Sequence, residues 1–174
     1  MTYSPISLAA EVQDGLTARR AVVALETSAI AQGLPFPFNL EAADRMEVAI
    51  RGAGAIPAMV GVLDGVIRVG LGRSEVRRLA EGADVVKLGR RDLAAAAAFR
   101  ETGGTTVSAV LHVCTMTGVA VFATGGIGGV HRGGALDVSE DLAALTCSSV
   151  VVVCSGAKSL LDLPATVERL EVMV

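Results

Sequence analysis

The sequence lacks the features that mark membrane, nucleic-acid-binding and secreted proteins. No apolar run reaches the roughly 18 residues that a membrane-spanning helix requires, although 52% of the 174 residues are hydrophobic. The net charge is -3 and the basic residues are scattered, so the positive patch of a nucleic-acid-binding protein is missing. Residues 1–15 show no basic segment followed by an apolar one, and we expect no secretory signal. These absences predict a cytoplasmic protein that binds a small molecule, with no nucleic-acid or membrane partner.

Cysteine is also scarce, and its number and spacing argue against a disulfide framework and against a metal site. The three residues Cys114, Cys147 and Cys154 are an odd number and do not have metal-ligand spacing. They are interpreted as reduced core residues. The length is that of one ordinary domain, so residues 1–174 are predicted to form a single domain with a substantial core.

What the sequence does contain is an alternation of short apolar runs and helical patterns. Strands are predicted at 21–25, 85–86, 120–124 and 150–154. Helices are predicted at 40–54, 74–83, 92–102, 141–149 and 164–172. Residues 105–119 fit either strand or helix, and their length and spacing favour helix. Asn39 is placed to cap the helix that follows it.

These elements predict an α/β fold. Asp64-Gly65 joins two β-branched runs and favours a tight turn, which predicts an antiparallel hairpin near residues 56–71. The other strands are almost fully apolar, above all residues 150–154, and are therefore expected to be buried. We predict a largely parallel sheet covered by helices on both faces.

Polar residues follow several of the predicted strands. They are Glu26, Lys87, the glycines of 125–129 with His131, and Lys158. In open α/β sheets the ligand site lies beyond the carboxyl ends of the strands, so these residues are expected to converge on one rim. A single lysine after a strand is usually a solvated loop charge, whereas a convergence of several polar groups favours a site.

The glycine-rich loop 125–129 has two interpretations. Glycines let backbone N–H groups approach a phosphate, but they also simply make turns. The loop lacks the P-loop lysine and the dinucleotide context, so it is weak evidence for a phosphate site. His131 could be a general acid, a phosphate donor or a loop residue bonded to a carbonyl.

Asp137, Ser139 and Asp141 alternate along the chain. An extended segment would place all three on one face, where the carboxylates would suit Mg²⁺ or Mn²⁺. The alternative is that Asp137 or Ser139 caps a helix that starts near Glu140.

Lys158 has the most specific chemical interpretation. An amine is a nucleophile only after it loses its proton, and burial among apolar residues or a nearby cation such as Lys87 favours the neutral form. A neutral amine can attack a sugar aldehyde to form a Schiff base. The small residues at 155–157 leave room for a substrate carbon beside it.

Seven stretches, taken in order, resemble one known family. They are LETSAIAQGLPFPFN, GAIPAMVGVLDGVIRVGL, KLGRRDL, GGTTV, FATGGIGGVHRGG, LDVSEDLAAL and CSGAKSLLDLPATVERLE. Together they resemble the motifs of the pseudouridine-5'-phosphate glycosidase family, also called the indigoidine synthase A-like family, from about residue 15 to the end. The resemblance implies cleavage of the C–C glycosidic bond of pseudouridine 5'-phosphate to uracil and ribose 5-phosphate, with bound Mn²⁺, in a homotrimer.

The resemblance also implies roles for individual residues. Lys158 matches the nucleophile that forms an imine with C1' of the opened sugar, and Glu26 matches the group that transfers a proton to the departing base. Lys87 and Val107 match substrate contacts. This agrees with the residue chemistry, because a C–C bond has no leaving heteroatom, whereas an iminium can act as an electron sink.

The remaining matches lie in the segment 131–141. Asp137 matches the metal ligand, and Ser139, Glu140 and Asp141 match a substrate-binding tripeptide. His131 lies in a matching stretch without an assigned role.

The chain departs from the family pattern in several places. Glu26-Thr27-Ser28 stands where the family reads Glu-Ser-Thr, and Phe38 and Glu140 replace a glutamine and an alanine. The family's chains continue well past the position of Val174 and return residues to the active site. We therefore expect either a fragment or a shortened relative, with apolar surface left bare that favours self-association. Two alternatives remain: an auxiliary or non-catalytic sugar-phosphate-binding homologue that needs a partner chain, and an ordinary nucleotide-binding domain.

Overall fold

An eight-stranded, mostly parallel sheet carries the fold. The computed structural model describes residues 6–133 and 137–173. The strands are β1 (Ile6–Leu8), β2 (Val22–Leu25), β3 (Ile56–Leu63), β4 (Val66–Val69), β5 (Val86–Leu88), β6 (Gly103–Thr105), β7 (Val121–Ala123) and β9 (Val151–Val153). The main path runs β1-β4-β3-β2-β7-β9, and β6 joins it through β3 and carries β5. Among these strands, β3 is antiparallel to β4 and β6, and the other pairs are parallel. A separate antiparallel pair joins β8 (Val130–His131) and β10 (Leu161–Asp162).

The predicted hairpin is confirmed in β3 and β4. Leu63 pairs with Val66, and the two turn residues Asp64 and Gly65 have φ of 51° and 80°. Positive φ at both central positions is the geometry of a primed turn, which Asp-Gly adopts at little cost. The α/β fold with a largely parallel sheet is confirmed as well.

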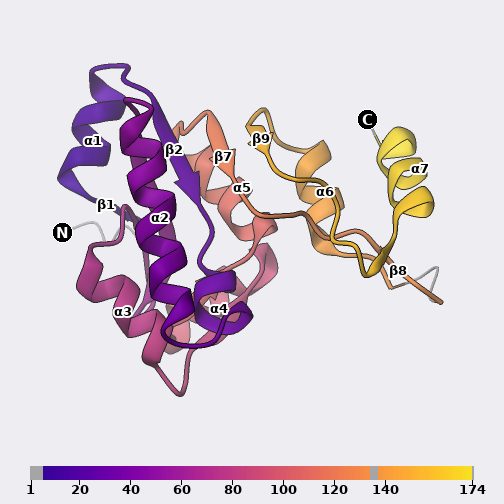
Figure 1. The fold of residues 1–174 in the computed structure, drawn as a ribbon, viewed down its shortest axis with the longest axis horizontal. Coiled ribbons are helices and arrows are strands. Elements are labelled where there is room, and N and C mark those ends of the chain that lie inside the picture. Colours follow the sequence, from indigo (N-terminus) through magenta and orange to yellow (C-terminus); the bar gives the residue numbers. More distant parts are fainter. Residues whose placement is uncertain (1–5, 134–136, 174) are drawn as a thin grey trace.

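Helices cover both faces of the sheet (Figure 1). The helices are α1 (Ala10–Thr17), α2 (Phe38–Gly52), α3 (Arg73–Glu81), α4 (Leu93–Phe99), α5 (Val107–Thr117), α6 (Glu140–Thr146) and α7 (Leu163–Met173). Of these, α7 packs against α6 and the β8–β10 pair, away from the main sheet. Residues of α1, α4 and α5 share one core cluster with Ile56 and Val60 of β3, while α2 and α3 share a second cluster with Met59. Because successive strand residues point to opposite faces, this division places α2 and α3 on the face opposite α5.

The helix over residues 105–119 is confirmed as α5, but Asn39 does not cap α2. Asn39 lies inside the first turn and is 2% exposed. Its side-chain amide donates to the carbonyls of Ile30 and Ala80 at 3.0 and 3.1 Å. Pro37 occupies the cap position, so the polar side chain is free to tie α2 to the chain around it.

One predicted helix end and the predicted burial of one strand are wrong. Gly103-Gly104 were expected to stop a helix, whereas the helix ends at Phe99, Arg100 turns with φ of 54°, and Gly103 opens β6. The strand at 150–154 was expected to be buried, but Val151 and Val153 of β9 are 61% and 57% exposed. β9 is the last strand of the path, so one of its edges has no neighbour in the described chain.

The three cysteines differ in burial. Cys114 is buried, Cys154 is half-buried and Cys147 is exposed, so the core interpretation is wrong for Cys147. All three are free thiols. Within residues 6–133 and 137–173, no helix is both long and apolar enough to cross a membrane.

Candidate active site

A two-lobed cavity lies at the strand ends. One lobe has a volume of about 480 Å³ and the other of about 740 Å³. Glu26, Ser28, Lys87 and Lys158 line both lobes, so they stand where the two meet. We call the first the polar lobe, lined further by Arg91, Asp92, Thr106, Val107, Ser108, Gly128, His131, Ser139, Glu140 and Asp141. We call the second the apolar lobe, lined further by Ala29, Ile30, Leu34, Ala42, Met46, Ala123 and the glycines at 125 and 126.

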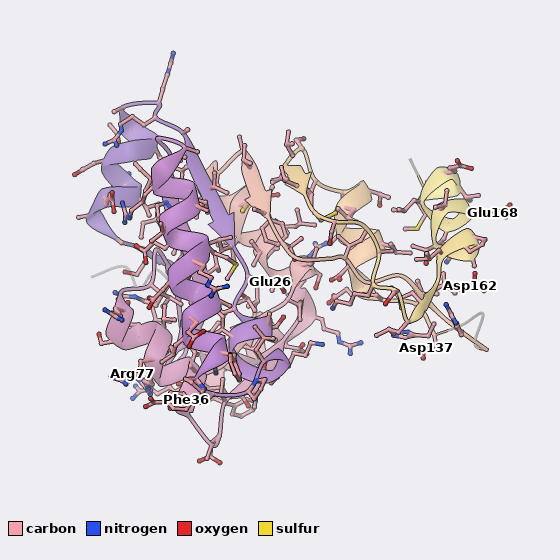
Figure 2. All side chains as sticks on the ribbon, in the orientation of Figure 1. Glu26, Phe36, Arg77, Asp137, Asp162 and Glu168 are labelled. Atoms are coloured by element: carbon pink, nitrogen blue, oxygen red, sulfur yellow. The ribbon has the colours of Figure 1, made fainter. Side chains whose placement is uncertain are left out.

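Glu26 directly follows β2 (labelled in Figure 2). It is half-buried. Both of its carboxylate oxygens accept a hydroxyl hydrogen bond. Ser28 donates to Oε2 at 2.8 Å, and Thr124 donates to Oε1 at 2.6 Å. The carboxylate is therefore held from two sides, by its own loop and by the end of β7.

Two buried threonines, Thr27 and Thr105, hold the loop that carries Glu26 against the neighbouring strands. The hydroxyls of Thr27 and Thr105 both donate to the carbonyl of Val60, at 2.7 and 2.5 Å. The backbone N–H of Thr105 donates to the Thr27 hydroxyl at 3.1 Å. Since both threonines are fully buried, these bonds fix the end of β2 against β6 and β3. Sequence reasoning did not single out this pair, because a threonine after a strand carries no distinctive pattern.

Lys158 follows β9 in a loop that runs beside the glycine-rich loop. The Lys158 N–H donates to the carbonyl of Ile127 at 3.1 Å, and the Ile127 N–H donates to the carbonyl of Gly156 at 3.0 Å. Residues 127 and 157 form an isolated parallel bridge. The lysine is thus placed by backbone pairing that continues beyond β7 and β9.

The expected burial of Lys158 is wrong for this chain. Lys158 is exposed, and so are its neighbours Ser155 and Leu160. The physical reason is its position beside β9, an edge strand with no covering element in the described residues. Lys158 does share its cavity with Glu26, which the predicted chemistry also requires.

The chain contains only two lysines, and both line this cavity. Lys87 lies on β5 and Lys158 follows β9, whereas the 13 other basic residues among the 15 are arginines. This contrast is a sequence signal that could have been used and was not. Arginine keeps its charge under nearly all conditions, so only these two side chains offer an amine for covalent chemistry.

Asp141 has a structural position that the spacing argument did not predict. It is 7% exposed, and its carboxylate accepts from the backbone N–H of Ser108 at 3.0 Å and of Gly128 at 2.8 Å. It therefore joins the N-terminus of α5 to the glycine-rich loop. Asp137, Ser139 and Asp141 do not share one face, because Asp141 is already inside α6 and Ser139 caps that helix.

Two neighbours complete the polar lobe. Glu140 accepts a hydrogen bond from the Ser108 hydroxyl at 3.0 Å. Val107 is the first residue of α5 and is 2% exposed. The structure thus brings Glu26, Lys87, Val107, His131, Ser139, Glu140, Asp141 and Lys158 to one cavity, while their roles remain predictions.

The glycine-rich loop is not an open phosphate cradle. The N–H groups of Gly126, Ile127 and Gly128 are already bonded, to the Thr124 hydroxyl, the Gly156 carbonyl and the Asp141 carboxylate. A Cβ added at Gly128 would collide with Ser139 and lie 2.8 Å from the Asp141 carboxylate. The glycine therefore allows close packing of the loop against α6.

Asp137 lies apart from the lining of the cavity. Its carboxylate is 3.2 Å from Nδ1 of His131, an ion pair when the imidazole is protonated, and its side chain is 72% exposed. Figure 2 shows Asp137 displaced from Glu26 toward α7. Among the described residues, no three His, Cys, Asp or Glu side chains are grouped to hold a metal ion.

These features define an α/β domain with a lysine and a glutamate in one strand-end cavity. The chain belongs to the family described as indigoidine synthase A like protein, whose model matches residues 11–174. A pseudouridine-5'-phosphate glycosidase of Myxococcus xanthus is 56% identical over 164 residues, which cover 92% of this chain and 54% of that protein. The enzyme of the same name from Escherichia coli is 46% identical over 169 residues, covering 95% of this chain and 54% of that protein.

Two solved structures share the fold. The prealnumycin C-glycosynthase AlnA in complex with ribulose 5-phosphate has a TM-score of 0.88 and 40% identity, covering 97% of this chain and 55% of that one. An indigoidine synthase A-like protein from Thermotoga maritima has a TM-score of 0.89 and 33% identity, covering 99% of this chain and 57% of that one. The chain thus spans about half the length of the relatives it matches.

Proposed function

We propose that this chain carries the lysine–glutamate site of a pseudouridine-5'-phosphate glycosidase. Its substrate would be a phosphorylated C-nucleoside, and its products uracil and ribose 5-phosphate. The observation that supports this most directly is the shared cavity: Glu26 and Lys158 line both of its lobes. Relatives that carry this enzyme name are 45–56% identical to the chain, and a neighbouring structure holds a pentulose phosphate.

The two lobes suit the two halves of such a substrate. In the polar lobe, Lys87 and Arg91 can face a phosphate, and hydroxyls such as that of Thr106 can bond to sugar oxygens. In the apolar lobe, Leu34 and Met46 offer a surface for a flat base. The bond to be cleaved would then lie where the lobes meet, next to Glu26 and Lys158.

The proposed reaction is balanced in two stages. After losing its proton, the Lys158 amine bonds to C1' as the C1'–O4' bond breaks. O4' takes a proton from Glu26, and the ammonium formed at the lysine nitrogen then gives its proton to Glu26. The nitrogen lone pair then forms the C1'=N bond while the C1'–C5 bond breaks, and C5 of uracil takes a proton from Glu26. Water hydrolyses the resulting imine, which releases ribose 5-phosphate and restores the lysine. Hydrolysis leaves the lysine as an ammonium, which returns its proton to Glu26 and restores both groups.

The Mn²⁺ that the family resemblance implies fits the donors only in part. Asp137 offers one exposed carboxylate, with His131 beside it. One carboxylate with water and substrate phosphate is a known way to hold a hard divalent cation. We propose that Asp137 would hold the ion next to His131, which lines the polar lobe.

The test follows uracil release and imine trapping. The chain is incubated with pseudouridine 5'-phosphate and Mn²⁺, and free uracil is measured. In parallel it is reduced with borohydride in the presence of ribose 5-phosphate, and the adduct is located by peptide mass. We expect uracil release and an adduct on Lys158.

The two lysines provide a matched control. Lys158→Ala should abolish both signals, whereas Lys87→Arg should keep the adduct because it leaves the reacting amine in place. Glu26→Gln should keep the adduct and slow uracil release by about 10²–10⁴-fold, the usual contribution of a general acid. An adduct that persists in Lys158→Ala would contradict the proposal.

A second candidate is favoured by the exposure of Lys158 and of β9. An auxiliary sugar-phosphate-binding protein completed by another chain would show the same polar lobe with an uncovered amine. It would bind ribose 5-phosphate but give neither adduct nor uracil until the partner chain is added. The trimer, the cytoplasmic location and the single-domain organisation remain predictions.

A further inference from the structure

We propose that Thr124 is a positioning residue that sets the place of Glu26 relative to Lys158. This inference rests on the function proposed above. Thr124 directly follows β7, so it belongs to neither the strand that carries the acid nor the loop that carries the lysine. It contacts both parts of the chain.

The first contact is made by the side chain. The Thr124 hydroxyl donates to Oε1 of Glu26 at 2.6 Å, the shorter of the two hydrogen bonds to this carboxylate. Its other contacts are weaker, at 3.4 Å from the Gly126 N–H and 3.5 Å to the Gly126 carbonyl. A hydrogen bond to a carboxylate is stronger than one between neutral groups, so the Glu26 bond fixes the hydroxyl.

The second contact is made by the backbone. The Thr124 N–H donates to the carbonyl of Val153 at 3.0 Å, which continues the parallel pairing of β7 and β9. The pairing reaches Ile127, Gly156 and the N–H of Lys158 a few residues later. Thr124 is thus the residue at which the strand leading to the lysine is bonded to the acid.

This position has a direct consequence for the proton transfer. A free glutamate rotates about three bonds, and proton transfer requires it within hydrogen-bond reach of the substrate atom. Ser28 alone would leave Oε1 without a fixed partner. The charged groups that line the cavity beside Glu26 are Lys87 on β5 and Lys158 after β9, with Arg91, Asp92, His131, Glu140 and Asp141 in the polar lobe. Their charges attract or repel the Glu26 carboxylate, but they do not fix its side chain in one rotamer.

The experiment compares three single variants of the whole chain. Thr124→Val removes the hydroxyl at nearly constant volume, and Thr124→Ser restores it. Thr115→Val is the matched control, because its hydroxyl bonds to the Leu111 carbonyl within α5 and does not line the cavity. Each is assayed for uracil release, for the borohydride adduct on Lys158, and by NMR couplings that report the Glu26 side-chain rotamer.

We expect a selective effect. Thr124→Val should lower kcat for uracil release by about 10–100-fold, the range expected for a misplaced catalytic group, with KM and adduct formation unchanged. The Glu26 couplings should change from one rotamer to an average. Thr124→Ser should restore both readouts, and Thr115→Val should match the parent chain.

The outcomes separate this inference from the proposed function. If Thr124→Val leaves the Glu26 couplings as in the parent chain, or lowers adduct formation as much as uracil release, the positioning role is overturned. If the parent chain forms neither uracil nor adduct, the proposed function fails, and the couplings alone then decide whether Thr124 holds Glu26.

Discussion

Replacing Asp141 with asparagine tests the tie that holds the polar lobe together. The carboxylate accepts two backbone N–H groups, from Ser108 at 3.0 Å and Gly128 at 2.8 Å, and the residue is 7% exposed. Asparagine has nearly the same shape but only one acceptor oxygen. Its amide would face the second N–H donor to donor, so one buried N–H would lose its partner.

The magnitude follows from these two bonds. A buried donor left unsatisfied costs about 1–3 kcal/mol. The surviving bond also loses the charge of its acceptor, which lowers its contribution by about 1 kcal/mol. We therefore expect Asp141→Asn to lower the free energy of unfolding by about 2–4 kcal/mol.

Urea unfolding followed by far-UV circular dichroism measures this change. The chain has no tryptophan and one tyrosine, so fluorescence would report little. Asp44→Asn is the control, since Asp44 has a side chain that is 53% exposed and pairs with Arg73 at the surface. Its effect should stay within about 0.5 kcal/mol. A loss below about 0.5 kcal/mol in Asp141→Asn would refute the argument that this carboxylate carries the two N–H groups.

Three further predictions concern other parts of the fold. Burial raises the pKa of the Cys114 thiol to about 12, so iodoacetamide should label exposed Cys147 in the native chain and Cys114 only after unfolding; native labelling of Cys114 would contradict its burial. Burial, with a smaller effect of a nearby arginine, lowers the pKa of His112 below 6.5, so the unfolded chain binds its proton more readily. The contribution of His112 to the free energy of unfolding is fully present above pH 6.5 and is lost as the pH falls toward the folded pKa. His112→Gln should therefore make the free energy of unfolding depend less on pH in this range. Gly104→Ala would place a Cβ 2.9 Å from the Thr27 carbonyl oxygen and should cost about 1–3 kcal/mol in urea unfolding, whereas a neutral result would mean that the β6 backbone can shift.

The sequence predicts those parts of the fold that depend on local chemistry. The Asp64-Gly65 hairpin is confirmed, because that dipeptide has the required φ values in almost any context. The strand-end rule also brought Glu26 and Lys158 to one cavity, since β2, β7 and β9 run in the same direction. For Lys87 the predicted strand end is wrong, because Lys87 lies within β5, which runs antiparallel to those strands.

The wrong predictions share a different cause. Gly103 looks like a helix stop, yet it lies in β6, where it pairs with Val62 and Val86. Val151 and Val153 look like core residues, yet they are exposed because of the place of β9 in the strand order. Strand order, and therefore which apolar strand lies at the edge, depends on long-range pairing that an apolar run does not encode.

The candidate site shows the same division. Residue identity points to an amine and an acid, but their relation is set by contacts between segments about a hundred residues apart in sequence, such as the Thr124–Glu26 hydrogen bond. That bond, the Thr124–Val153 backbone bond and the Ile127–Lys158 backbone bond form a continuous chain from acid to lysine. Two of these three links are backbone bonds, which side-chain substitutions elsewhere in the cavity leave in place. It follows that the cavity lining can change in shape and charge while the spacing between the two reacting groups is kept, and that the Thr124 hydroxyl is the one link in this chain that a single side-chain substitution removes.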